Sequence, residues 1–134
     1  IQLSKAILAN NSNLKKIINI VHKEIRKNLR SFLNKNKTKK FVILDIPLLL
    51  ENKINKKKDI LIYVETSKTH ILRKLKKRKN FNLKILNKFK KIQLPLVYKK
   101  RNSRFIIKNK FTQKSVKDEI KKILKTIKNE RSSS

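Results

Sequence analysis

Apolar residues recur every three or four positions along residues 12–35, which is the period of one face of an α-helix. Eight positions carry this pattern: Leu14, Ile17, Ile18, Val21, Ile25, Leu29, Phe32 and Leu33. The pattern predicts one long amphipathic helix or two abutting ones. Ser12 is the expected N-cap, since a hydroxyl can accept from the first free backbone N–H groups.

Two later runs are apolar without a helical period. Residues 41–46 (FVILDI) form a continuous run that is ended by Pro47, and residues 59–65 (DILIYVE) form a second run of the same kind. Such runs are typical of strands covered on both faces. Two buried strands in an otherwise helical chain predict a parallel α/β architecture.

The second half of the chain reads as short basic helices around one further strand. The expected elements are a helix over 68–79 behind Thr66 and Ser67, one from the cap Asn82 to about Gln93, a strand at 104–107 and a terminal helix from Thr112. Residues 131–134 should fray. Neither a repeat nor a linker interrupts residues 1–130, which predicts one domain.

The formal charge of +31 is the most conspicuous feature of the composition. Clustered Lys and Arg indicate nucleic-acid binding. However, the chain holds 32 Lys, 19 Ile and 15 Asn but only seven Arg and two Ala. The abundant types have A/T-rich codons, so codon bias accounts for the charge without a nucleic-acid partner. We therefore expect Lys to fill solvated positions along the whole chain.

Glycine is absent from all 134 residues. About nine would be expected at the usual ~7% usage. Gly-rich phosphate-binding loops need residues without a Cβ, because the backbone approaches the phosphate closely. If this is a nucleotide enzyme, its phosphate loop lies outside these residues.

Signals for export, membrane insertion and thiol chemistry are missing. The chain has no Cys and two His, which excludes disulfides and leaves little for a metal site. Its longest apolar stretch, residues 41–50, is far shorter than the ~20 residues of a membrane-spanning helix. The opening IQLSKAILANN lacks a signal peptide. We interpret the chain as the middle of a longer cytoplasmic, soluble gene product.

The segment DIPLLLE, residues 45–51, stands at the end of the first predicted strand. FVILDIPLLLE resembles the dephospho-CoA kinase family, in which a hydrophobic strand runs into Asp-x-Pro-Leu-Leu-Phe/Leu-Glu. A second strand and an Arg-bearing helix then follow. Here Leu50 occupies the variable position, and LIYVETSKTHILRKLKKR follows at the expected distance.

A weaker mark of the same family precedes this segment. IVHKEIRKNL keeps the family's His and Arg as His22 and Arg26. Lys23 stands where the family usually has Pro, which weakens inference about that position only.

Two further marks follow it. KKIQLP resembles the family's helix ending in Gln-x-Pro, and Arg78 lies 15 positions before Gln93. SRFIIKN resembles the family's Ala-Asp-x-x-Ile-x-Asn, with Asn109 retained and Arg104 in place of Asp. The resemblance thus spans nearly the whole chain.

The resemblance implies transfer of the ATP γ-phosphate to the ribose 3′-hydroxyl of dephospho-CoA. It implies a P-loop NTPase-like parallel sheet with flanking helices and a helical lid, of which the first strand and P-loop are missing here. The lid and basic helices would cover about residues 68–101. The cofactors would be ATP and Mg²⁺, and the partners small molecules, with no specific nucleic acid, no membrane, and a monomer or weak oligomer.

Site residues follow from the same resemblance. Asp45 would act in catalysis at a strand end and hold Mg²⁺ through water, although an Asp at such a turn can also simply accept backbone donors. Pro47 would stiffen the turn, and Leu48 would line a pocket wall or pack, and would not contact phosphate. His22 would support that pocket or serve the core alone.

The lid would present cations to the transferring phosphate. Arg78 corresponds to the family's lid arginine, and Arg73 or Lys74 supplies the other cation, since Arg gives paired donors and Lys a point charge. The alternative for any single Lys is a solvated helix face. Asn109 either caps the turn before the last helix or approaches the adenine.

Two other functions stay open at this point. A basic RNA-binding or ribosome-associated protein without catalysis explains the charge directly but leaves DIPLLLE without a use. A related nucleotide kinase would share the fold and lid but accept another hydroxyl.

Overall fold

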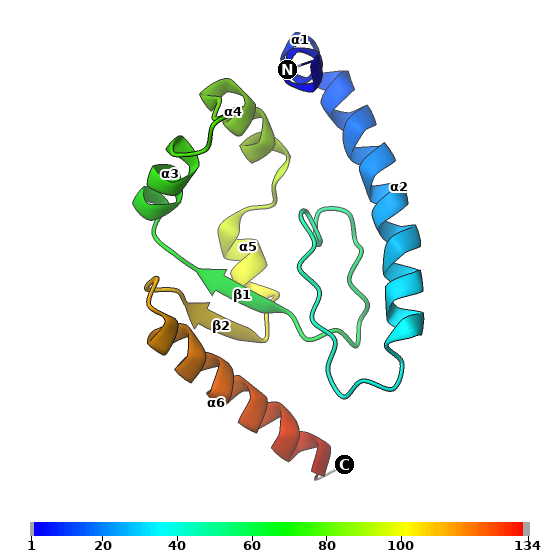
Figure 1. The fold of residues 1–134 in the computed structure, drawn as a ribbon, viewed down its shortest axis with the longest axis vertical. Coiled ribbons are helices and arrows are strands. Elements are labelled where there is room, and N and C mark those ends of the chain that lie inside the picture. The colour runs from blue at the N-terminus through cyan, green and yellow to red at the C-terminus, as the bar shows by residue number, and fades with distance from the viewer. Residues whose placement is uncertain (1, 133–134) are drawn as a thin grey trace. The chain divides into compact units, whose positions relative to one another are not determined.

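The computed structural model describes residues 2–132. Within them the elements follow the order α1 (Gln2–Ala9), α2 (Asn11–Lys35), β1 (Ile62–Glu65), α3 (Lys68–Lys76), α4 (Leu83–Ile92), α5 (Leu96–Arg101), β2 (Phe105–Lys108) and α6 (Gln113–Ser132) (Figure 1). They divide into two compact units. The first comprises Ile1–Lys57 and Asn82–Gln93, and the second Lys58–Phe81 and Leu94–Ser134.

The first unit begins with two consecutive helices. Asn10 separates α1 from α2, and its side-chain oxygen accepts a hydrogen bond from the Ser12 N–H at 2.9 Å. The prediction that Ser12 is the N-cap is therefore wrong by two residues. The reason is that Asn10 has the extended backbone of a cap and reaches the N–H two positions on, so the helix starts earlier.

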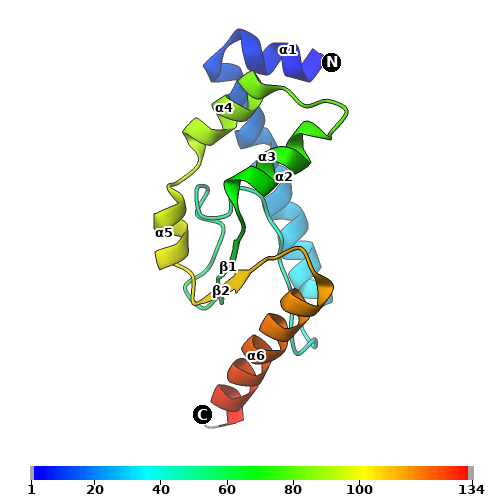
Figure 2. The same cartoon turned by 90° about the vertical axis from the view of Figure 1, so that its left-hand side faces the viewer.

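Helix α4 packs against α1 in this unit (Figure 2). The Lys88 ammonium of α4 donates to the carbonyls of Ile7 at 2.8 Å and Leu8 at 3.1 Å. These carbonyls lie in the last turn of α1, where no intrahelical partner exists, so a cation is favourable there. Ile7 and Leu14 are buried beside this junction.

Residues 41–46 belong to neither a helix nor a strand, so the predicted strand there is wrong for the described residues, whose one sheet contains β1 and β2. Side chains along the segment alternate between exposed and half-buried, and Ile43 is 89% exposed. A strand requires a neighbour for its backbone groups as well as an apolar sequence. The sequence of this segment shows the apolar pattern, but it cannot show whether a neighbouring strand is present.

The second unit is built on a parallel pair of strands, with Ile62 opposite Phe105 and Glu65 opposite Lys108. Helix α6 packs on β2, and Ile107 is buried with Ile123 and Ile127 (Figure 1). The mixed α/β prediction is confirmed at this level. The strand predicted at 104–107 is confirmed with a shift of one residue.

The caps predicted from sequence are largely confirmed. Ser67 and Asn82 cap α3 and α4 with their side-chain oxygens, and Thr112 accepts from the Ser115 N–H before α6. Helix α3 is shorter than the predicted 68–79, because the Arg78 N–H turns back to the Leu75 carbonyl at 3.0 Å.

Two other differences lie at the C-terminal side of the chain. Helix α5, behind Pro95, was not predicted, because its six residues are too few to show a period. Helix α6 continues to Ser132, so the first two residues of the expected frayed tail are helical. The last two, 133–134, lie outside the described residues.

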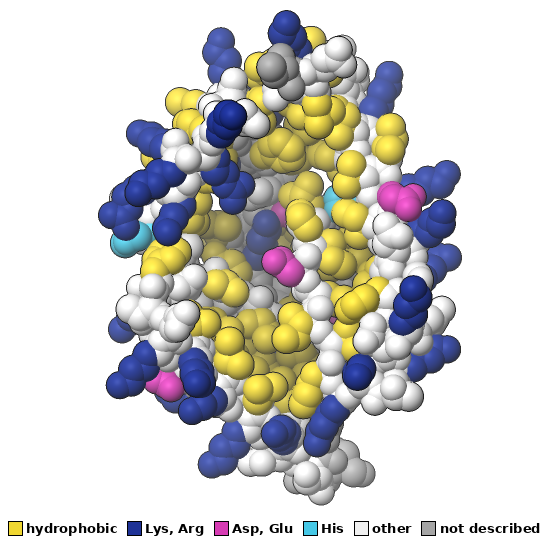
Figure 3. Space-filling model, viewed as in Figure 1, with side chains coloured by type: hydrophobic (Ala, Val, Ile, Leu, Met, Phe, Trp, Pro, Cys, Tyr) yellow, Lys and Arg dark blue, Asp and Glu magenta, His cyan; other side chains and the backbone are white. Residues whose placement is uncertain are grey.

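Basic side chains are spread around the visible face and do not gather in one patch (Figure 3). They follow the outer sides of helices, as expected for Lys at solvated positions. Within residues 2–132, no helix combines the length and apolar character needed to cross a membrane.

Candidate functional site

The extended segment of the first unit ends in a compact turn at DIPLLLE. Asp45 is exposed at its start, and the turn is closed by backbone hydrogen bonds from Asn52 to Leu48 (3.1 Å) and from Ile54 to Leu49 (3.0 Å). Leu48 has a φ of 54°, in the left-handed region that favours glycine. The turn therefore holds Leu48 in a conformation that costs free energy.

Helix α2 contacts this turn through two side chains. His22 is buried, with 5% exposure, and its Nε2 lies 3.1 Å from the Asn52 Nδ2. One helical turn further on, the Arg26 guanidinium donates to the Asn52 carbonyl at 2.8 Å. Asn52 thereby connects the predicted site residues His22 and Leu48, because its Nδ2 also donates to the Leu48 carbonyl at 3.0 Å.

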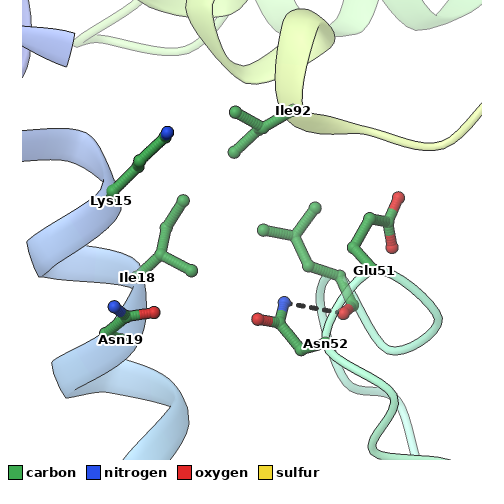
Figure 4. A pocket seen from close by; sticks show the side chains of 7 residues that line it. Lys15, Ile18, Asn19, Glu51, Asn52 and Ile92 are labelled. Carbon is green, nitrogen blue, oxygen red and sulfur yellow. Dashed lines mark hydrogen bonds between the residues drawn. The ribbon is translucent and has the colours of Figure 1, made fainter. Parts of the chain in front are cut away.

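A pocket of about 220 Å³ opens between α2 and this turn (Figure 4). Its lining combines three aliphatic side chains with a cation, a carboxylate and two amides: Ile18, Leu48, Ile92, Lys15, Glu51, Asn19 and Asn52. Leu48 is among these lining residues. The pocket thus places an apolar wall beside charged and amide groups.

In the second unit, the carboxyl ends of β1 and β2 lie together because the strands are parallel. Asn109 follows β2, and its Oδ1 accepts from the Phe111 N–H at 2.8 Å, while its own N–H donates to the Glu65 carbonyl at 2.9 Å. Asn109 thus organises the turn before α6, which was one of its two expected roles. Crevices at this edge of parallel sheets are where α/β enzymes bind ligands.

An aromatic pair stands beside this turn. Phe111, 45% exposed and with a φ of 59°, stacks on His70 with ring centroids 5.1 Å apart. The Lys74 ammonium lies 5.9 Å from the centre of the Phe111 ring, within the range of a cation–π contact. Two predicted site residues therefore contact Phe111: Lys74 lies over its ring, and Asn109 accepts from its backbone N–H.

The other predicted lid cations are exposed on or just after α3. Arg73 is in the last turn of the helix, and Arg78 follows it in the turn that leads to Phe81. Their exposure allows both guanidinium groups to reach a phosphate ligand. A turn also gives Arg78 more freedom of direction than the helix that the sequence predicted.

The pKa of Glu65, the last residue of β1, is displaced from its usual value. A hydrogen bond from the Lys100 side chain at 2.6 Å lowers the pKa of Glu65 below 4.5, and the charges of Lys100 and Lys108 lower it further. Partial burial of the carboxyl opposes this shift in the pKa. Glu65 is thus held as a carboxylate near neutral pH.

Within residues 2–132, no group of three or more His, Asp or Glu side chains gathers into a cage for a cation. Mg²⁺ is commonly held by one or two carboxylates together with water and substrate phosphates. Asp45, a single exposed carboxylate at the head of the turn, fits that mode.

Sequence reasoning missed three residues that organise these sites: Asn52, His70 and Phe111. Asn52 follows DIPLLLE directly, but nothing in its spacing indicates a contact with a residue 30 positions earlier. Phe111 gives no local signal, since its left-handed backbone is at odds with its residue type.

Comparison with known proteins gives one consistent result. The family model described as dephospho-CoA kinase matches residues 1–115. The dephospho-CoA kinase of Wolbachia pipientis wMel is 31% identical over 127 residues, which are 93% of this chain and 65% of that protein.

Two further dephospho-CoA kinases match in the same way. That of Rickettsia bellii is 31% identical over 93 residues, 69% of this chain and 49% of the relative. That of Prochlorococcus marinus is 28% identical over 123 residues, 92% and 58% respectively. The chain spans no more than 65% of the length of any of these three curated relatives.

Proposed function

The chain belongs to the dephospho-CoA kinase family, and on that premise we propose that the complete protein transfers the ATP γ-phosphate to the ribose 3′-hydroxyl of dephospho-CoA. The observation that carries the proposal is the match of the family model over residues 1–115. The pocket also supports the proposal, because it lies beside DIPLLLE, the segment on which the family resemblance rests.

The complete protein would have the fold of P-loop kinases. The 134 residues contain no Gly, so the loop that cradles the ATP phosphates must come from residues outside them. The greater length of the relatives is consistent with such a segment. In the complete sheet, residues 41–46 would gain the strand neighbour that they lack here, and the exposed Ile43 would be covered.

The turn after residues 41–46 would serve the acceptor side of the reaction. Asp45 would hold Mg²⁺ through water, and the bound cation would neutralise charge on the transferring phosphate. Pro47 would limit the freedom of the turn. Leu48 would form a wall for dephospho-CoA, and the buried His22 would support that wall from behind.

Cations of the second unit would serve the phosphate side. Arg78, with Arg73 or Lys74, would bring positive charge to the transferring group when the lid closes. The exposed positions of all three support this role. Asn109 would hold the turn beside which the nucleotide base lies.

The test is an assay of the complete protein with ATP, Mg²⁺ and three acceptors: dephospho-CoA, AMP and adenosine. We expect phosphorylation of dephospho-CoA at the 3′-hydroxyl and little of the others. Asp45→Asn should lower kcat and raise the Mg²⁺ concentration needed for half-maximal rate, without lowering Tm. Preference for AMP or adenosine would instead indicate a related nucleotide kinase.

A further inference from the structure

We propose that Asn52 is a positioning residue for the phosphate transfer: its side-chain amide ties the turn that begins at Asp45 to His22 on helix α2. This inference rests on the proposed function. The site residues Asp45, Leu48 and His22 came from the family resemblance, whereas Asn52 emerges from the hydrogen bonds of this structure alone.

Both protons of the Asn52 amide are committed. One is donated to the Leu48 carbonyl at 3.0 Å (Figure 4), and the other points to the His22 Nε2 at 3.1 Å. The orientation of the amide follows from the Leu48 carbonyl, which can only accept, so a flipped amide would set two oxygens against each other. The nitrogen of Asn52 must therefore face His22.

This orientation assigns the tautomer of His22. The Nε2 of His22 must accept from the Asn52 amide, so the ring proton of the neutral imidazole is on Nδ1. Protonated Nε2 would oppose the amide protons and break the tie. The Nδ1 of His22 is buried and has no hydrogen-bond partner among residues 2–132, so the Asn52 contact is the one described contact that selects the tautomer.

The tie holds a turn that would otherwise relax. Leu48 and Lys53 both have positive φ values, 54° and 49°, although neither is glycine. Each such position costs free energy relative to an ordinary backbone conformation. The Asn52 side chain bonds one of these residues, and the Arg26 guanidinium holds the Asn52 carbonyl at 2.8 Å. Without the amide, the turn loses the contact that offsets its strain.

The hydrogen bonds of the Asn52 amide control the position of the turn and take no direct part in the phosphate transfer. Asn52 and Leu48 line the same pocket, so a shift of the turn changes the wall against which the acceptor would lie. Asp45 precedes Leu48 by three residues and leads into the turn that contains Leu48. Catalysis is sensitive to such shifts, since a displacement of about 1 Å can cost roughly 10²-fold in rate.

The test uses two variants of the complete protein. Asn52→Leu keeps the approximate shape and removes both amide bonds. Asn52→Asp replaces the donor that faces His22 with an acceptor and cannot donate to the Leu48 carbonyl. Asn55→Leu is the matched control, because it makes the same change three residues further along the chain.

The first readout is the ¹⁵N NMR signature of His22 at about pH 8, where imidazole in water is neutral, with His22→Gln to assign the signals. We expect the Nδ1–H tautomer in the wild type and the Nε2–H form in Asn52→Asp. An Nε2–H tautomer in the wild type would overturn the proposal. This readout does not depend on activity, so it stands apart from failure of the proposed kinase function.

The second readout is kinetic. Asn52→Leu should lower kcat/KM for dephospho-CoA about tenfold or more, with KM for ATP nearly unchanged and Asn55→Leu near wild type. Equal losses in both Leu variants, or a lower Tm with unchanged kcat/KM, would assign Asn52 to structure only. Absence of any kinase activity in the wild type would refute the proposed function, while the tautomer would still test the tie.

Discussion

The ring of His70, on helix α3, stacks on the ring of Phe111, which follows strand β2, with the two planes 28° from parallel. The Oγ of Ser67, the N-cap of α3, lies 2.7 Å from the His70 Nδ1, and this hydrogen bond fixes the direction of the ring. Phe111 reaches the stack from a left-handed backbone with a φ of 59°. Helix α3 is thus held to the turn before α6 by an aromatic contact that opposes a backbone cost.

The balance at Phe111 gives the first prediction. Phe111→Ala removes the stack but keeps a Cβ in the left-handed region, whereas Phe111→Gly removes the stack and the strain together. The Gly variant should be more stable than the Ala variant by about 1 kcal/mol. Urea unfolding of both variants measures the difference. A less stable Gly variant would show that Phe111 is not strained.

The Glu65–Lys100 pair gives a prediction about pH. The pKa of Glu65 is lowered from 4.5 in the folded protein, chiefly by its hydrogen bond with Lys100. Its contribution to stability is therefore present above pH 4.5 and disappears as the pH falls below that value through the lowered pKa. Glu65→Gln should lower Tm above pH 4.5 and matter progressively less below it.

Thermal unfolding across that range tests this, with Glu24→Gln as a control on helix α2. A loss of Tm in Glu65→Gln that is the same at every pH would exclude the ion pair as its cause. Because both side chains are partly accessible to solvent, added salt should also reduce the difference.

Local signals explain what the sequence predicted well. Helix α2 and its apolar face, the caps Ser67 and Asn82, and strand β2 all follow from residues within a few positions of each other. The strand predicted at residues 41–46 was wrong, because a strand also requires a neighbouring strand, which the local sequence does not show. Helix α5 was missed because a run of six residues has no readable period.

In the candidate site, too, local sequence signals indicate some residues and miss those that depend on long-range contacts. Leu48 could be singled out because the motif that contains it is contiguous in sequence, and it lines the pocket beside α2. Asn52 could not be predicted, since its importance comes from a side chain on α2 and from a backbone conformation that Leu48 alone would disfavour. Long-range polar contacts of this kind leave no period or spacing in a single sequence.

Arg78 gives a prediction for turnover. In the complete protein, Arg78→Ala should lower kcat roughly 10²-fold with little change in Tm, because a lid cation acts on charge that develops during transfer. Arg78→Lys should recover only part of the rate, since it lacks paired donors. Lys79→Ala, the neighbouring exposed cation, is the control. An unchanged rate with a lowered Tm would assign Arg78 to structure.

The dispersed charge predicts weak, nonselective contact with nucleic acid. Binding of the complete protein to bulk RNA should weaken steeply as salt rises, because dispersed Lys side chains act through counterion release. Fluorescence anisotropy with two unrelated RNA sequences at several salt concentrations measures this. Salt-resistant binding that distinguishes the two sequences would favour the RNA-binding alternative over the kinase.

The central claim is that these 134 residues belong to a kinase whose phosphate loop lies outside them. The most direct measurement is ATP-dependent formation of coenzyme A from dephospho-CoA by two proteins at equal concentration, the complete gene product and residues 1–134 alone. The account predicts product with the complete protein and none with residues 1–134, because no Gly-rich loop can be formed from them. Coenzyme A formed by residues 1–134 alone, or none formed by the complete protein, would contradict it.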